Sequence, residues 1–165
     1  MKLKSQVPIL IADDDHEDRE MIQDAMKESH LLNEIHFVKD GEELMNYLHH
    51  RQNFKDVEKH PMPGLILLDL NMPKKDGREA LKEIKSDPNL KLIPVVVLTT
   101  SQAEEDVFRS YNLGVNSFVT KPVTFESLVA IIKIWAAIGL KSSNFRKENQ
   151  KSLNELQDGQ LASHR

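Results

Sequence analysis

Carboxylates follow two apolar runs of this sequence, at the point where each run ends. Residues 7–12 are followed by Asp13 and Asp14, and residues 64–68 run directly into Asp69. Short apolar runs bounded by turn residues are typical of strands buried on both faces of a parallel sheet. Because ligands bind beyond the carboxyl ends of such strands, we expect these carboxylates to lie together at one edge of the sheet.

A hydroxyl group and an ammonium group follow two further apolar runs. Residues 93–98 lead into Thr99, and residues 115–120 lead into Lys121. Carboxylates that share a pocket repel one another unless a cation is present, and hard oxygen ligands suit Mg²⁺. Such a pocket favours phosphoryl transfer to a carboxylate, because the metal and the lysine neutralise the phosphoryl oxygens. We expect Asp69 to be the acceptor.

The segments that must position these groups alternate between strand and helix patterns. Apolar residues at helical spacing lie between the strand-like runs, and residues 35–38 form one more short strand pattern. This order, β-α repeated five times, predicts an α/β fold in which helices cover both faces of a parallel sheet. The helices are expected at about residues 17–29, 41–51, 77–86, 102–113 and 125–138.

Smaller signals mark the boundaries. Asp40 is expected to cap the second helix, and Asp15 fits a helix N-terminal charge better than a metal ligand. Residues 52–63 are polar, contain two prolines and indicate a loop longer than most connections. A second metal site could be sought at three histidines, but no carboxylate lies at a matching helical spacing. These histidines are His49, His50 and His60.

The amino-acid composition restricts the classes of protein to which this chain can belong. The 165 residues carry a net charge of -4, with 29% charged and 39% hydrophobic residues, which fits one ordinary domain. The absence of cysteine excludes disulfides and thiolate chemistry and is compatible with the cytoplasm, where we expect the protein. No signal peptide, membrane span or basic cluster with interleaved aromatic residues is evident, so we expect neither a membrane nor a nucleic acid as partner.

In combination, these motifs resemble the receiver domain of two-component response regulators. They are, in chain order, Ile-Leu-Ile-Ala-Asp13-Asp14, Leu-Leu-Asp69-Leu-Asn71-Met72-Pro73, Val-Leu-Thr99 and Lys121-Pro122. The resemblance implies a flavodoxin-like (βα)5 fold with a doubly wound, five-stranded parallel sheet. We predict a receiver domain over residues 7–140, followed by a polar, mobile tail over residues 141–165.

The resemblance also implies how the acceptor and the metal are held. Asp69 would take the phosphoryl group from a histidine kinase. Asp14 and Asp69 would bind Mg²⁺ directly, together with the backbone carbonyl of Asn71, and Asp13 would act through a metal-bound water. Lys121 would pair with Asp69 and later with a phosphoryl oxygen. The chain would then catalyse only its own phosphorylation and dephosphorylation.

A switch and a set of partners follow from the same resemblance. Thr99 would hydrogen-bond the phosphoryl group and move inward, and Phe118 would follow as an aromatic switch. The long loop before Asp69 and the absence of an output domain resemble the single-domain, CheY-like regulators that partner bacterial phytochromes. Many of those pair through their last helix. The helix expected at residues 125–138 is apolar on more than one side, so we expect a homodimer through it.

Two other functions compete with the signalling role. Mg²⁺-dependent phosphohydrolases also use an aspartyl nucleophile, and they typically place a second aspartate two residues later as the general acid. That position is Asn71 here, which cannot donate and recover a proton. A receiver that only binds partners, without being phosphorylated, is disfavoured because the chain keeps the full set of residues that the resemblance requires. They are Asp13, Asp14, Asp69, Thr99 and Lys121.

Overall fold

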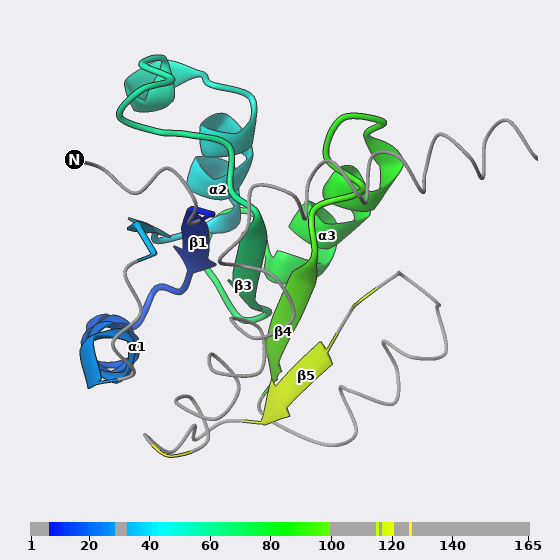
Figure 1. The fold of residues 1–165 in the computed structure, drawn as a ribbon. Helices are drawn as coiled ribbons and strands as arrows, with labels where there is room; N and C mark the ends of the chain where they lie inside the picture. The colour runs from blue at the N-terminus through cyan, green and yellow to red at the C-terminus, as the bar shows by residue number, and fades with distance from the viewer. Residues whose placement is uncertain (1–6, 29–32, 100–114, 116, 121–125, 127–165) are drawn as a thin grey trace, which may run out of the picture.

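Five parallel strands form one sheet at the centre of the structure. The computed structural model describes residues 7–28, 33–99, 115, 117–120 and 126. The strand order is β2-β1-β3-β4-β5, and each neighbouring pair is parallel (Figure 1). The strands are β1 (Ile9–Ala12), β2 (Ile35–Val38), β3 (Leu65–Asp69), β4 (Val95–Thr99) and β5 (Ser117–Thr120). The predicted α/β, five-stranded parallel sheet is therefore confirmed.

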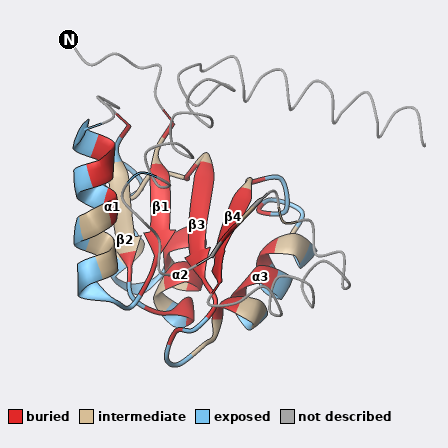
Figure 2. Cartoon of the chain, turned by 90° about the horizontal axis from the view of Figure 1, so that it is seen from below, coloured by how far each residue is buried: buried red, intermediate tan, exposed pale blue. Residues whose placement is uncertain are grey.

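Helices cover both faces of this sheet. One face packs against α1, and the other packs against α2 and α3, as Figure 2 shows. The helical segments are α1 (His16–Glu28), α2 (Gly41–Leu48), the short 3-10 helix η1 (Gln52–Phe54) and α3 (Gly77–Ser86). The predicted later helices, the dimer surface and the tail lie outside the described residues. Within the described part of the chain, no helix is long and apolar enough to cross a membrane.

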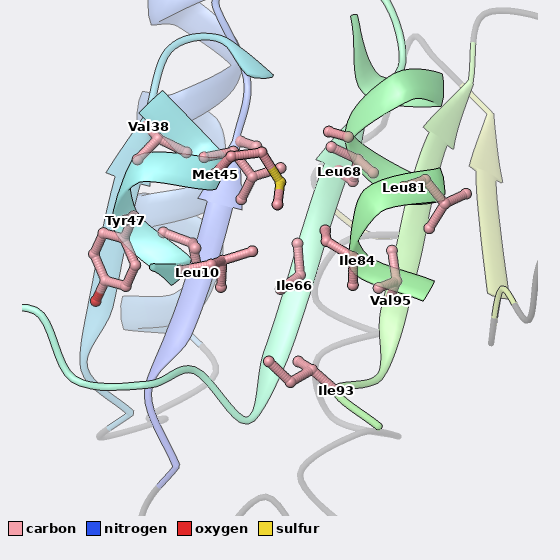
Figure 3. Packing of buried hydrophobic residues seen from close by; sticks show 14 of the residues in the cluster. Leu10, Val38, Met45, Tyr47, Ile66, Leu68, Leu81, Ile84, Ile93 and Val95 are labelled. Atoms are coloured by element: carbon pink, nitrogen blue, oxygen red, sulfur yellow. The ribbon is translucent and has the colours of Figure 1, made fainter. Parts of the chain in front are cut away.

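The core explains why the strands read as unbroken apolar runs. Every residue of β1, β3 and β4 is buried. Leu10, Ile66 and Val95 lie on the α2 and α3 side, where Figure 3 shows them among residues from both helices. Ile9 and Leu65 belong to the cluster on the α1 side. Because both faces of the sheet are covered, successive side chains are apolar whichever way they point.

Several boundaries differ from the prediction for local reasons. The strands β1 and β4 begin after Pro8 and Pro94, two residues later than expected, because proline cannot donate to a ladder. The helix α2 ends at Leu48 rather than near residue 51. There His50 and Gln52 take positive φ values of 53° and 54°, which end the helix and turn the chain into η1.

Aspartate caps set the helix starts. Asp40 was predicted to cap α2, whereas Asp15, predicted only as a charge at a helix N-terminus, also caps α1. Asp40 Oδ1 accepts a hydrogen bond from the Glu43 N–H at 2.8 Å. Asp15 Oδ1 accepts one from the Glu17 N–H, also at 2.8 Å. Such caps satisfy N–H groups that have no partner inside the helix. They fix where α1 and α2 leave the carboxyl edge of the sheet.

Candidate functional site

The sheet topology brings the ends of β1 and β3 together. Ala12 pairs with Leu68, so Asp13 and Asp69 are the next residues on adjacent strands. β1 connects onward to β2 on one side, while β3 lies on its other side. The strand order therefore reverses between β1 and β3, and a crevice at such a reversal is where ligands bind in open α/β sheets.

Three carboxylates converge at this point. Asp13, Asp14 and Asp69 each offer an oxygen, and these oxygens all lie within 4.8 Å of one another. Asp13 is 0% exposed and Asp69 is 3% exposed, while Asp14 faces solvent. Like charges this close repel, and hard oxygen donors match Mg²⁺ or a similar divalent cation. The residues present therefore fit a divalent metal, and no other such group of three or more occurs among the described residues.

Backbone contacts hold the end of β1 in place. The Asp13 N–H donates to the Val38 carbonyl at 3.1 Å, and Asp13 Oδ1 accepts from the Asp15 N–H at 2.9 Å. The Asp13 carbonyl accepts from Arg19 Nη1 at 2.8 Å. Arg19 was not among the residues predicted from sequence to belong to the site. Its only signal was its place in the first half of the helix that follows Asp13 and Asp14.

The end of β3 is held equally closely. The Asn71 N–H donates to Asp69 Oδ1 at 3.1 Å, and the Gly77 N–H donates to the Leu70 carbonyl at 3.0 Å. A Cβ atom at Gly77 would lie 2.3 Å from the Asp69 carbonyl oxygen, so only glycine fits there without a shift. The sequence indicated that a helix starts here, but it gave no sign of this contact with Asp69.

The remaining predicted residues lie on β4 and β5 or just beyond them. Thr99 ends β4, next to the strand of Asp69, and is 0% exposed. Its hydroxyl has no hydrogen-bond partner among the described residues, which suits it to receive a polar ligand. Phe118 on β5 is half-buried against the α2 and α3 side of the core. Thr120 pairs with Thr99, and Lys121 follows it outside the described residues.

The histidines do not assemble into a second metal site. His50 Nε2 lies 2.9 Å from the His60 carbonyl oxygen, so this nitrogen donates rather than binds metal. The His60 ring packs on Phe54 and Tyr47, with ring centroids 5.1 Å and 5.5 Å apart. Histidines contribute to none of the three-ligand groups found in the described part of the chain.

The fold and the three converging carboxylates define a flavodoxin-like α/β protein with an acidic cluster at its β1/β3 edge. The family model for the response regulator receiver domain matches residues 9–133. The response regulator Rcp1 of Synechocystis sp. is 46% identical over 125 residues, which cover 76% of this chain and 83% of Rcp1. The chain therefore belongs to the response regulator receiver domain family.

Solved structures agree with this assignment. The bacteriophytochrome response regulator RtBRR gives a TM-score of 0.71 at 44% identity, covering 78% of this chain and 76% of that one. The phosphorylated cyanobacterial phytochrome response regulator RcpA gives 0.70 at 45% identity, covering 82% and 94%. A structure of Rcp1 with Mn²⁺ bound gives 0.70 at 44% identity, covering 78% and 94%. The chain is thus a response regulator receiver protein. It is similar to phytochrome-associated regulators, of which RcpA is phosphorylated and Rcp1 holds Mn²⁺ in these structures.

Proposed function

We propose that Asp69 is the residue that accepts the phosphoryl group, with Mg²⁺ as the cation. The observation that carries this assignment is the convergence of Asp69 with Asp13 and Asp14 at the β1/β3 edge. Asp14, Asp69 and the backbone carbonyl of Asn71 would hold the metal directly, and Asp13 would hold it through water. When bound, Mg²⁺ neutralises charge on the phosphoryl oxygens.

The chain's own groups then orient the transfer. Asp69 lies almost fully buried, and the Asn71 N–H fixes the orientation of its carboxylate through Oδ1. An Asp69 oxygen attacks phosphorus, a new O–P bond forms, and the bond between phosphorus and the donor breaks. The Thr99 hydroxyl donates to a phosphoryl oxygen, and Lys121 pairs with another. Movement of Thr99 toward that oxygen releases space for Phe118, which shifts the equilibrium between two surface states.

The partner we propose is a histidine kinase of the bacterial phytochrome class, in the cytoplasm. The similarity to RtBRR and RcpA, both described as phytochrome response regulators, supports this choice. Neither nucleic acid nor membrane is part of the proposal. The domain is proposed to span residues 7–140, with residues 141–165 as a tail.

Phosphorylation of the purified protein tests the acceptor. Incubation with acetyl phosphate and Mg²⁺ should add one phosphoryl group to the intact mass of the wild type and none to Asp69→Asn. Full labelling of Asp69→Asn would contradict the assignment. If the small donor fails with the wild type, a phytochrome kinase supplies the decisive trial, and failure of both donors would favour a receiver that only binds partners.

The chain is proposed to act on its own carboxylate and not on outside substrates. Residue 71, two positions after the acceptor, is an asparagine and cannot serve as a general acid. Rapid turnover of a simple phosphomonoester with Mg²⁺ would revive the phosphohydrolase alternative. The control variant is Asp69→Asn, which should abolish any phosphomonoester turnover that depends on this site.

A homodimer through the last predicted helix completes the proposal. Its support is the pattern of apolar residues at 128–138, which is wider than one helix face. Replacing Ile134 or Ile138 with glutamate should shift sedimentation toward the monomer. A variant that stays folded and dimeric would contradict this interface.

A further inference from the structure

Arg19 reaches from α1 back to the end of β1. Its Nη1 donates to the backbone carbonyl of Asp13 at 2.8 Å, and the side chain is half-buried. The helix itself is anchored at this end, because the Arg19 N–H donates to the Asp15 carbonyl at 3.1 Å and Asp15 caps the helix. The guanidinium therefore extends from a fixed turn to the backbone of a carboxylate residue.

The contact acts on Asp13, the most deeply buried of the three carboxylate residues. Asp13 follows Ala12, the last paired residue of β1, so the regular ladder no longer determines its position alone. Its N–H and Oδ1 are held by Val38 and Asp15, while its carbonyl takes the Arg19 bond. Hydrogen bonds from an ionised donor are stronger than neutral ones, and a guanidinium stays charged at any working pH.

We propose that Arg19 is a positioning residue for the cation site. It holds the turn of Asp13 and Asp14 so that their carboxylates stay within reach of Asp69. The inference rests on the proposed use of these three carboxylates to bind the metal. Arg19 also brings positive charge to the backbone of Asp13, and removal of charge alone would tighten cation binding. The positioning role predicts the opposite sign, which makes the two effects separable.

The affinity for Mn²⁺ can be measured without any phosphoryl donor. Mn²⁺ is titrated into the metal-free protein, and electron paramagnetic resonance reports the concentration of the free ion. Arg19→Met should bind Mn²⁺ about 10-fold more weakly than the wild type, the scale on which partners of metal ligands act. Arg51→Met removes the same charge from the turn before η1 and should leave binding unchanged. A role limited to folding would lower the melting temperature of Arg19→Met without changing the affinity of the folded protein.

A second variant keeps the test decisive if Arg19→Met does not fold. Arg19→Lys retains the charge but shortens the reach, so it should also bind Mn²⁺ more weakly than the wild type. Affinity equal to or tighter than that of the wild type, in whichever variant folds, would overturn the inference. Asp14→Asn distinguishes the absence of an Arg19 effect from the absence of a metal site at the three carboxylates. If the wild type binds Mn²⁺ and Asp14→Asn does not, the site stands. If the wild type itself does not bind, the site and the inference both fall.

Discussion

Among the described residues, two regions gather titratable side chains, and only the carboxylates of one converge closely enough to fit a metal ion. At the acidic edge, defined by Asp13, Asp14 and Asp69, three oxygens lie within 4.8 Å of one another. The histidine cluster is defined by His36, His50, His60, Tyr47 and Phe54. There the rings of His36, His60, Tyr47 and Phe54 pack on one another instead, and His50 bonds to the His60 carbonyl. The Tyr47 ring centroid lies 5.8 Å from that of His36 and 5.5 Å from that of His60. Convergence on a shared point, rather than the density of polar residues, distinguishes the site.

The difference follows from how each region is built. Parallel strands end at the same edge of the sheet, so the topology itself places the residues after β1 and β3 together. The histidine cluster arises where the loop after α2 folds back. There the Tyr47 hydroxyl donates to the Pro61 carbonyl at 2.9 Å, and His50 bonds to the His60 carbonyl. These polar groups close the loop, and each already has a hydrogen-bond partner there.

The largest expected effect contrasts the two regions directly. Asp14→Asn removes a proposed ligand and should weaken Mn²⁺ binding by at least the ~10- to 100-fold that loss of an outer partner costs. His60→Ala should leave Mn²⁺ binding unchanged, because His60 packs against rings and is not one of the three converging carboxylate residues. Calorimetric titration of both variants measures this contrast. Comparable losses of Mn²⁺ affinity in the two variants would contradict this contrast between the two regions.

Close packing at the acidic edge gives the next effect. Gly77→Ala would place a Cβ 2.3 Å from the Asp69 carbonyl oxygen and 2.7 Å from Leu70 Cα. Because backbone must shift to make room, we expect a loss of about 1–3 kcal/mol in the free energy of unfolding. Urea denaturation measures it. Glu79→Ala, on the exposed face of the same helix, is the control and should stay within about 0.5 kcal/mol of the wild type.

The histidine cluster should respond in stability alone. Tyr47→Phe removes the bond to Pro61 from a side chain that is 1% exposed and should cost about 1 kcal/mol of unfolding free energy. Phosphorylation by acetyl phosphate should proceed at the wild-type rate. A variant of normal stability with slowed phosphorylation would show that this region is coupled to the acidic edge.

The smallest expected effect is a loss of stability at alkaline pH that depends on Tyr47 alone. Burial, assisted by the Glu34 carboxylate, raises the pKa of the Tyr47 hydroxyl above its ordinary value of 10.0. Above pH 10.0 the unfolded chain loses this proton while the folded chain keeps it, so stability falls as pH rises. Below pH 10.0 the contribution is complete. Urea midpoints on either side of this pH should therefore fall more for the wild type than for Tyr47→Phe, and equal slopes would refute the assignment.

The parts of the fold that follow from pattern could be predicted from sequence. The apolar runs ending in Asp13, Asp69 and Thr99 indicated a parallel sheet and the edge at which the carboxylates converge, because both depend only on residue order. The contacts of Arg19 and Gly77 with this edge could not be found in this way. Each contact depends on how a helix packs against the end of a strand. Neither an arginine nor a glycine in the sequence indicates such a contact.

The long loop shows the same limit. Its prolines and polar residues indicated irregular structure at residues 52–63, and the structure has η1 and turns there. What composition could not show is that Phe54 and His60 turn inward onto Tyr47. Ring packing of this kind depends on the positive φ values at His50 and Gln52, which direct the chain back toward α2.

Chemical trapping of the phosphoryl group tests the central claim most directly. Borohydride reduces an acyl phosphate to an alcohol, so a phosphorylated aspartate becomes homoserine and can be located by peptide mass mapping. After reaction with acetyl phosphate and Mg²⁺, we expect homoserine at position 69 and at no other aspartate. Homoserine at position 13 or 14, or an acid-labile phosphoryl group retained on a histidine, would contradict the assignment of Asp69 as the acceptor.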